Sequence, residues 1–144
     1  MTENKFMQTA LDLARQSALE GEVPVGAVIV KDGEIVGTGR NRREYGKNAL
    51  YHAEIEAIDS ACKKLGGWRL WQCEMYVTLE PCPMCASAIK QSRISRIYYG
   101  VESSNANNHR IFEMICKNKD NNSSIEYNPN SGRVCKVTFK EISR

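Results

Sequence analysis

The chain has 144 residues and a formal net charge of +3; 42% of its residues are hydrophobic and 26% are charged. A chain of this length can bury one hydrophobic core and is too short for two, so we expect a single domain spanning residues 1–144. The composition excludes a fibrous or disordered chain, and no apolar run approaches the roughly 20 residues that cross a bilayer. The net charge is too small to identify a nucleic-acid partner, so its local distribution matters more.

The N-terminus and the cysteines both indicate a reducing compartment. Residues 1–5 lack the basic and apolar regions of a secretory signal, which predicts a cytoplasmic protein with no membrane association. Six cysteines in such a chain do not indicate a disulfide framework. Four of them are expected to be buried, reduced thiols, with a metal ligand or a redox-sensitive thiol as the alternative. These four are Cys62, Cys73, Cys116 and Cys135.

The first half of the chain predicts a helix, a β-hairpin and a second helix. Apolar residues at helical spacing precede Gly21, which fits the end of a helix. Asp32-Gly33 between two apolar runs is a strong hairpin signal. A second helical pattern ends at Gly66. In chain order we expect a helix at Lys5–Glu20, strands at Val25–Val30 and Ile35–Gly39, a polar, basic loop at Arg40–Leu50 and a helix at Tyr51–Leu65.

The second half continues the alternation of strands and helices. A third apolar strand leads to Pro83, which suits the first turn of a helix because it has no N–H to leave unpaired. The order of strands and helices from Val25 onward predicts an α/β layered domain with right-handed crossovers. The expected elements are a strand at Glu74–Leu79, a helix at Pro83–Gln91, a strand at Ile94–Gly100, a short helix at Arg110–Lys117 and a hairpin of Ser124–Tyr127 with Arg133–Phe139.

The most informative motif is His52-x-Glu54, followed later in the chain by Pro81-Cys82-x-x-Cys85. One imidazole and two thiolates make three zinc ligands, one fewer than a closed structural site takes. In catalytic zinc sites the fourth position holds a water, whose pKa the metal can bring near neutrality. Glu54 follows the ligand His52 closely enough to handle the proton of that water without binding metal. We therefore predict one zinc ion per chain, held by His52, Cys82 and Cys85, with Glu54 as the catalytic residue.

The spacing of these residues also indicates the reaction. The pattern H-x-E followed by P-C-x-x-C is the signature of the zinc deaminases that act on nucleobases. In that reaction an exocyclic amine on an aromatic base is replaced by a carbonyl oxygen and ammonia is released. The competing interpretation is a structural zinc site completed by Cys73 or His109. Glu54 and the proline before Cys82 argue against it, because a structural site has no use for a carboxylate that does not bind metal.

Further segments match a known family: Val23–Val30, Gly39–Asn41, His52–Ile55, Gly67–Leu70, Tyr76–Ala86, Ser92–Ile94 and Tyr99–Gly100. In these segments the chain resembles the bacterial tRNA adenosine deaminases of the cytidine-deaminase superfamily. The resemblance implies a three-layer α/β fold, with a mixed five-stranded sheet between helices and zinc at the N-termini of two of them. It implies that His52, Cys82 and Cys85 bind zinc. It also implies that Glu54 shuttles protons, that Asn41 hydrogen-bonds the base or its sugar, and that the protein is a homodimer.

Three segments depart from the pattern of that family. Asn48 to Tyr51 replaces the usual Asp/Asn-Pro-Thr/Ser-Ala before the His-Ala-Glu motif, and Val101 to Asn108 lacks the Pro, Lys and Gly of the expected loop. A predicted hairpin stands in place of the amphipathic C-terminal helix. Tyr51 is a candidate substrate-binding residue that stacks on a base, and the alternative is an ordinary residue at a helix start.

Other polar and aromatic residues also have two interpretations. The basic residues of the loop before the zinc motif either contact phosphates or form a solvated surface; they are Arg40, Arg42, Arg43 and Lys47. Asn41 could likewise cap the loop after a strand. Trp68 and Trp71 are expected in the core or at an interface.

The sequence therefore predicts a cytoplasmic zinc hydrolase that acts on a C–N bond of a nucleobase. The preferred substrate is adenosine in a tRNA anticodon loop, which would become inosine. The alternative substrate is a free base or nucleoside of the guanine, adenine or cytosine class. An alternative of another kind is a non-catalytic zinc-binding subunit that binds RNA or a protein partner, and the intact Glu54 argues against it.

Overall fold

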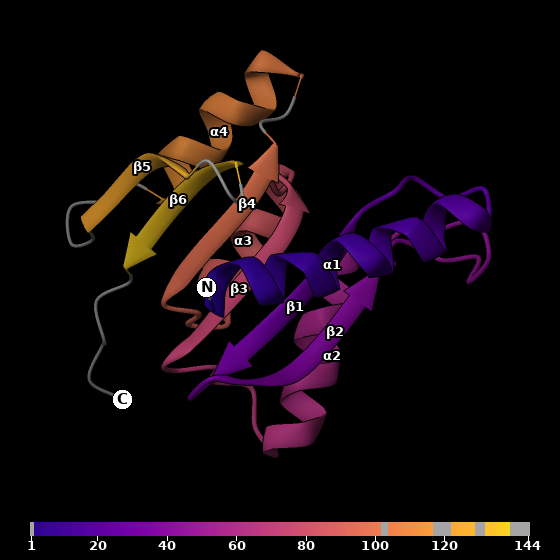
Figure 1. Ribbon diagram of the computed structural model, residues 1–144, viewed down its shortest axis with the longest axis horizontal. Helices are drawn as coiled ribbons and strands as arrows, with labels where there is room; N and C mark the ends of the chain where they lie inside the picture. Colours follow the sequence, from indigo (N-terminus) through magenta and orange to yellow (C-terminus); the bar gives the residue numbers. More distant parts are fainter. Residues whose placement is uncertain (1, 102–103, 117–121, 129–131, 139–144) are drawn as a thin grey trace.

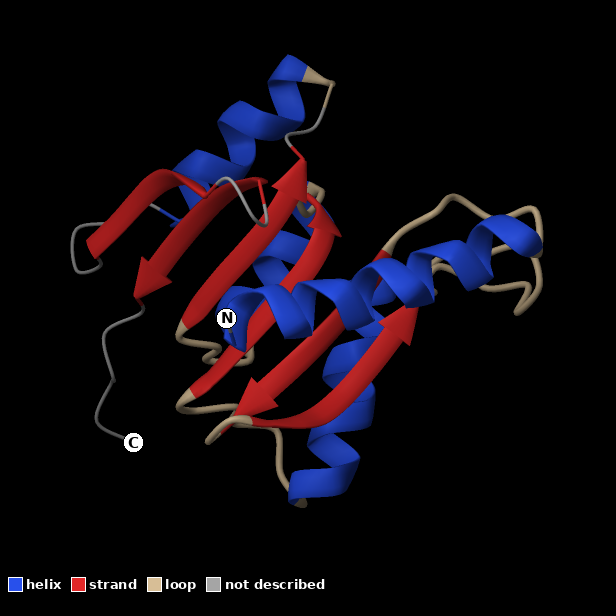
Figure 2. Ribbon diagram, in the orientation of Figure 1, coloured by secondary structure: helices blue, strands red, loops and turns tan. Residues whose placement is uncertain are grey.

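The computed structural model describes residues 2–101, 104–116, 122–128 and 132–138. Figure 1 labels its helices and strands, and Figure 2 distinguishes the helices from the strands of the sheet they cover. In chain order the elements are α1 (Thr2–Leu19), β1 (Gly26–Lys31), β2 (Glu34–Arg40), α2 (Ala53–Leu65), β3 (Cys73–Leu79), α3 (Pro83–Gln91), β4 (Arg96–Val101), α4 (Ala106–Cys116), β5 (Asn122–Asn128) and β6 (Gly132–Thr138).

The central sheet has four strands in the order β2-β1-β3-β4. β1 is antiparallel to β2 and β3, whereas β3 and β4 are parallel and are joined through α3. The predicted α/β fold with a mixed sheet is confirmed, but the predicted number of five strands is wrong for this sheet. β5 and β6 pair with each other as a separate antiparallel ribbon, and β6 lies against β4 (Figure 1).

Helices cover both faces of the sheet, because successive side chains of a strand point to opposite faces (Figure 2). On one face α1 packs on alternate residues of the central strands, with Tyr76 and Tyr98 stacked at a centroid distance of 4.6 Å. On the other face α2 and α3 cover the sheet, and Phe112 of α4 meets Tyr99 edge-on. The core on the face covered by α1 is built from Phe6, Met7, Ala10, Val28, Val30, Tyr76 and Tyr98. The sheet is therefore packed on both faces, and it supports the loops that connect its strands to the helices.

The predicted β-hairpin of the first half is confirmed. Asp32 has a φ of 53° and Gly33 a φ of 77°, so both central residues of the turn are left-handed. Turns with two left-handed residues match the right-handed twist of the strands they join. The hairpin brings Arg40, at the end of β2, opposite Gly26 at the start of β1.

The second helix begins two residues later than the sequence predicts. His52 is the N-cap of α2, with an extended backbone, and its carbonyl accepts the N–H of Glu56. Tyr51 instead belongs to the preceding loop, because its N–H donates to the carbonyl of Asn48. The predicted stop is confirmed: Gly66 has a φ of 77° and its N–H donates to the carbonyl of Cys62.

Glycine at position 39 lets α2 approach β2 closely. A Cβ there would overlap the carbonyl oxygen of Ala53 and the backbone nitrogen of Ala57, which are backbone atoms of α2 that cannot move aside. We expect Gly39→Ala to lower the free energy of unfolding by about 1–3 kcal/mol or more, as overpacking does. Thermal unfolding measures this. Gly67→Ala is the matched control, because a Cβ at Gly67 meets nothing within 4 Å; equal melting temperatures for the two variants would contradict the argument.

The C-terminal elements agree with the sequence-based expectation of a short helix and a hairpin. α4 covers Ala106–Cys116, and β5 and β6 pair with Asn128 opposite Gly132. Across the part of the chain that the structure describes, no helix combines the length and the apolar character needed to span a membrane.

Candidate active site

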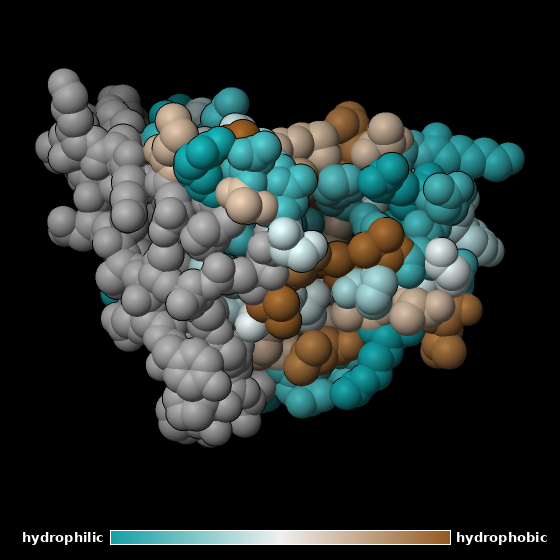
Figure 3. All heavy atoms as spheres, turned by 90° about the horizontal axis from the view of Figure 1, so that it is seen from above, coloured by the Kyte–Doolittle hydropathy of each residue, from teal (hydrophilic) through white to brown (hydrophobic). Residues whose placement is uncertain are grey.

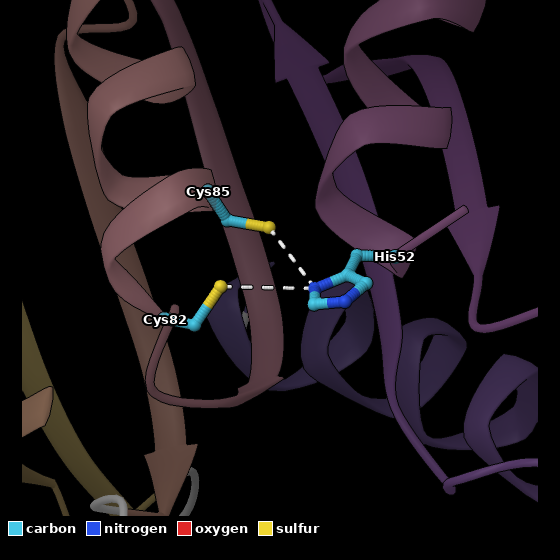
Figure 4. Close-up of side chains that lie close together, drawn as sticks. All are labelled: His52, Cys82 and Cys85. Atoms are coloured by element: carbon cyan, nitrogen blue, oxygen red, sulfur yellow. Dashed lines mark hydrogen bonds between the residues drawn. The ribbon is translucent and has the colours of Figure 1, made fainter. Parts of the chain in front are cut away.

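Two helix N-termini meet beyond the end of β3. β3 ends at Leu79, and the chain then passes to Cys82, the N-cap of α3, with Pro83 in the first turn as predicted. His52 holds the equivalent N-cap position on α2. The imidazole of His52 points across to the thiols of Cys82 and Cys85 on α3 (Figure 4). Residues from distant parts of the sequence therefore form one cluster at two positive helix ends.

The separations in this cluster fit a tetrahedral zinc ion. His52 Nδ1 lies 3.7 Å from Cys82 Sγ and 3.5 Å from Cys85 Sγ, and the three ligand atoms all lie within 4.8 Å of one another. Zn–N and Zn–S bonds of ordinary length at a tetrahedral angle place nitrogen and sulfur about 3.6 Å apart. The donor set of one imidazole and two thiols also suits zinc. Among the residues that the structure describes, this group is the one able to hold a metal ion.

The environment of the cysteines favours a thiolate. The pKa of Cys82 is lowered to about 5, chiefly because the thiol of Cys85 lies within hydrogen-bonding reach, with help from the backbone N–H groups of Met84 and Cys85. Cys85 is fully buried, and its pKa is raised because it shares a proton with Cys82. A cation is therefore needed before both sulfurs can carry negative charge together.

Glu54 lies beside this cluster and is 4% exposed. Burial raises its pKa to about 7, and the neighbouring Cys82 adds to the rise, while its own backbone N–H and Cys85 lower it. A carboxyl group with a pKa near neutrality both accepts and donates a proton readily, which suits a general acid–base residue.

The cluster opens into a cavity of about 140 Å³. Its metal-binding and acidic residues, His52, Cys82 and Glu54, share it with Asn41, which is only 6% exposed. The other residues around it are Val23, Val25, Arg43, Leu79, Glu80 and Asn108. The structure thus places the predicted residue Asn41 in the same pocket as the predicted zinc site.

An apolar groove adjoins this cavity. It is lined by residues of α1 and by the ends of β3 and β4, and it shares Val23, Val25 and Leu79 with the cavity. Figure 3 looks at the molecule from above the view of Figure 1 and shows hydrophobic side chains gathered near the middle of this face. The cavity beside the His/Cys/Cys cluster therefore adjoins an apolar groove through these three shared residues.

Residues 1–101 match the family described as the cytidine and deoxycytidylate deaminase zinc-binding region. That range contains the His/Cys/Cys cluster together with Asn41 and Glu54. The chain belongs to this deaminase family. The cofactor of the family is zinc, in agreement with the donor set and its geometry.

Known members of the deaminase family share a large part of the chain. The tRNA-specific adenosine deaminase of Bacillus subtilis is 46% identical over 101 residues, which cover 69% of this chain and 63% of the relative. A solved structure from studies of A-to-I editing by tRNA:A34 deaminases is 46% identical, with a TM-score of 0.67, over 69% of this chain and 76% of the other. The guanine deaminase of Bacillus subtilis is 40% identical, with a TM-score of 0.68, over 72% and 66%. The chain thus spans slightly less than two thirds of the length of the curated relatives it matches.

In this deaminase-family chain, the basic loop differs from the sequence-based expectation. Arg40 pairs with Glu20, and Arg42 pairs with Glu56. Arg43 instead lines the cavity, and Lys47 lies exposed in the loop. Two of the four basic side chains are therefore engaged by carboxylates of the same chain, and Arg43 is the one that lines the cavity beside the His/Cys/Cys cluster.

Tyr51 is not brought into the metal-binding cavity. It lines a separate cavity of about 370 Å³ with Arg42, Asn48 and Leu50, on the side of Ile55 and Asp59. Its ring packs against Gly46, where a Cβ would overlap it. The structure therefore gives Tyr51 a packing contact inside the loop of this deaminase domain.

The residues outside the site mostly match their simpler interpretations. Cys73 is buried, its thiol lies 3.6 Å from the carbonyl oxygen of Trp71, and burial raises its pKa. It begins β3, whereas the zinc cluster lies beyond the other end of that strand, so it does not complete the metal site. Trp68 does not lie in the core, which was one of its two predicted places: it is 51% exposed, with the guanidinium of Arg69 4.3 Å from its ring centroid. The side chains of His109, Cys116 and Cys135 lie outside the described residues.

Sequence reasoning missed the carboxylates that hold the loop of this deaminase site. Glu22 is 6% exposed and accepts the N–H groups of Glu44 and Tyr45, and Glu56 accepts from Arg40 and Arg42. Their partners are 14 to 23 residues away in the chain. No pattern of adjacent residues predicts such pairs, since acidic residues on helices and loops are usually solvated.

Proposed function

We propose that this chain is a zinc-dependent hydrolase that converts an amino-substituted nucleobase to its oxo form. The observation that carries the proposal is a buried carboxyl, Glu54, with a pKa near 7, beside a His/Cys/Cys cluster in one small cavity. A non-catalytic zinc-binding subunit would not need this costly arrangement, because burying a carboxyl group without a task destabilises the fold.

In this proposal His52, Cys82 and Cys85 hold the metal, which when bound supplies Lewis acidity to the attacking water. Glu54 removes one proton from that water and passes it to the ring nitrogen; it then takes the remaining proton of the added hydroxyl group and delivers it to the leaving amine, as the C–N bond breaks and the carbonyl forms. Water and the aminated base thus become the oxo base and ammonia. Asn41 hydrogen-bonds the base or its sugar, and burial of the pocket limits competing water.

For the substrate we propose adenosine in tRNA. The support is the name of the relatives at 46–48% identity, all called tRNA-specific adenosine deaminase, and the tRNA:A34 deaminase among the structures. The apolar groove next to the cavity supports a substrate larger than a free base, since it leaves room for a neighbouring nucleotide. The match to guanine deaminase, at an equally high TM-score, favours a free purine base as the second candidate.

We further propose a cytoplasmic homodimer. The support for the dimer is the resemblance of the chain to a family whose members are usually homodimers. Light scattering of the purified protein should give twice the chain mass of 16.2 kDa. A mass of one chain at micromolar concentration would refute the dimer.

A panel of substrates tests the activity. Ammonia release should be measured from a tRNA anticodon stem-loop, adenosine, guanine, adenine and cytosine, and inosine should be measured in the stem-loop product. Inosine formation supports the tRNA assignment. No inosine at any salt concentration, together with efficient turnover of guanine, would falsify the tRNA assignment and leave the deaminase chemistry standing.

The salt dependence of binding gives a sharper prediction about Arg43. If RNA is the substrate, the logarithm of its affinity should fall steeply with the logarithm of salt concentration, because bound phosphates release counterions. Arg43→Ala should reduce the slope by about one, the value for one lost phosphate contact. Lys63→Ala is the control, since Lys63 pairs with Asp59 on the exposed side of α2. An unchanged slope in Arg43→Ala would show that Arg43 does not contact phosphate.

A further inference from the structure

Asn41 is held in the pocket through the backbone of the segment around it. Its N–H donates to the carbonyl of Val25 at 3.1 Å, and its carbonyl accepts the hydroxyl of Ser17 at 2.8 Å. The residues on either side of Asn41, Arg40 and Arg42, are both bound by one carboxylate of α2. The position of Asn41 therefore depends on what holds its two neighbours.

That group is the carboxylate of Glu56. One of its oxygens accepts the backbone N–H of Arg40 at 3.1 Å, and the other accepts Nε of Arg42 at 2.9 Å together with the second guanidinium nitrogen. A single side chain thus binds both flanks of Asn41. Both guanidinium nitrogens of Arg42 donate to the same carboxylate oxygen, and hydrogen bonds between charged groups are stronger than neutral ones.

Glu56 also connects this segment to the metal cluster. Its backbone N–H donates to the carbonyl of His52 at 3.1 Å, in the first turn of α2. The same turn carries Glu54. The proposed zinc ligand, the proposed proton-shuttle residue and the carboxylate that holds the Asn41 segment therefore lie at positions 52, 54 and 56, within the N-cap and first turn of one helix.

We propose that Glu56 is a positioning residue for substrate binding, which holds Asn41 in register with His52 and Glu54. The proposal rests on the proposed deaminase function and deepens it. The Glu56 side chain belongs neither to the His/Cys/Cys group nor to the lining of the 140 Å³ cavity; it lines the neighbouring cavity around Tyr51, and its hydrogen bonds reach the Asn41 segment through Arg40 and Arg42. Catalysis is sensitive to such placement, because a small displacement of a binding group can reduce the rate by roughly 100-fold.

The test compares Glu56→Ala, Glu56→Gln and Arg42→Ala with the control Asp59→Ala. Asp59 is an exposed acid on the same helix, paired with Lys63. We expect Glu56→Ala to keep its zinc and its fold and to lose roughly 10- to 100-fold in kcat/KM on the anticodon stem-loop, or on guanine if that is the base turned over. Most of the loss should be in KM, because Asn41 contributes binding rather than proton transfer.

The two other variants should separate the two contacts. Glu56→Gln keeps an oxygen that can accept from Arg40 but loses the charge that attracts Arg42, so its loss should be smaller than that of Glu56→Ala. Adding Arg42→Ala to Glu56→Ala should cause little further loss, because both remove the same interaction and the effects of coupled residues do not add. If Glu56→Ala fails to fold, Glu56→Gln and the single variant Arg42→Ala carry the test: each should raise KM relative to Asp59→Ala, and KM values equal to that of Asp59→Ala would overturn the positioning role.

Amide hydrogen exchange gives a second measurement that does not depend on activity. The N–H groups of Arg42 and Gly46 are bonded within the loop, to Tyr51 and Arg42, and should exchange faster in Glu56→Ala than in Asp59→Ala. Kinetics and exchange equal to those of Asp59→Ala would overturn the positioning role. A wild-type protein that releases no ammonia from any substrate would instead refute the proposed function, and the exchange experiment would still test whether Glu56 holds the loop.

Discussion

Replacing Glu54 by alanine is expected to reduce kcat by roughly 10²- to 10⁴-fold while leaving zinc bound, the scale on which positioned acid–base groups contribute. Glu54 is not one of the three ligand residues, so its loss should not empty the metal site. It is buried with a pKa near 7, which is where a group that must both take and return protons works best. The measurement is the turnover of the preferred substrate at saturating concentration, with zinc content determined on the same sample.

Two further variants make this result specific. Glu54→Gln keeps the shape and hydrogen bonding of the side chain but cannot carry a proton between water and base, so it should be as slow as the alanine variant. Asp59→Ala removes an exposed acid from the same helix and should turn over at the wild-type rate. Normal turnover in Glu54→Gln would exclude the proton-shuttle role, and loss of zinc from that variant would identify Glu54 as a metal ligand.

The metal cluster was predictable because its information is local. Each half of the motif lies at the start of a helix, where the N-cap and the proline in the first turn can be recognised from a few adjacent residues. The turn at Asp32-Gly33 is equally local, since two left-handed residues require such a pair. The family pattern then brought His52 and Cys82 together, which their separation in the chain alone could not do.

The features of the structure that the sequence did not predict depend on contacts between distant segments. The charge of Arg42 is visible in the sequence, but its neutralisation by Glu56, 14 residues away, is not. The same holds for Tyr51, whose ring packs on Gly46 because the loop folds back on itself. The number of strands was also misjudged: β6 lies against β4, but the four-stranded sheet of the described residues ends at β4, and β5 and β6 pair with each other.

The geometry suggests why the zinc ligands and the loop share one helix end. When two helix N-termini form a catalytic cluster, the relative positions of its side chains depend on how those helices pack on the sheet. Gly39 allows α2 to lie against β2 backbone to backbone, and Glu56, in the first turn of α2, accepts the backbone N–H of Arg40, the last residue of β2. The backbone next to Asn41 is therefore fixed to the core, although Asn41 itself lies in a loop.

Removal of one zinc-binding thiol is expected to abolish activity. Cys82→Ala and Cys85→Ala should each retain little of the one zinc per chain that the wild-type protein holds, because three protein ligands hold a catalytic zinc and two hold it far more weakly. Metal analysis of the purified variants, before and after dialysis against a chelator, measures the loss. Thermal unfolding should show lower melting temperatures as well, since zinc bound to the folded state alone stabilises it.

Cys62→Ala is the matched control for these variants. Its thiol is half-buried, lies 3.9 Å from the carbonyl of Trp68 and does not belong to the metal cluster, so zinc content and turnover should be unchanged. Stoichiometric zinc in Cys82→Ala or Cys85→Ala would mean that other residues dominate metal binding. Loss of zinc from Cys62→Ala as well would point to general unfolding instead of ligand removal. Only loss confined to the two thiols of α3 agrees with a His/Cys/Cys site whose remaining position is open to water and substrate.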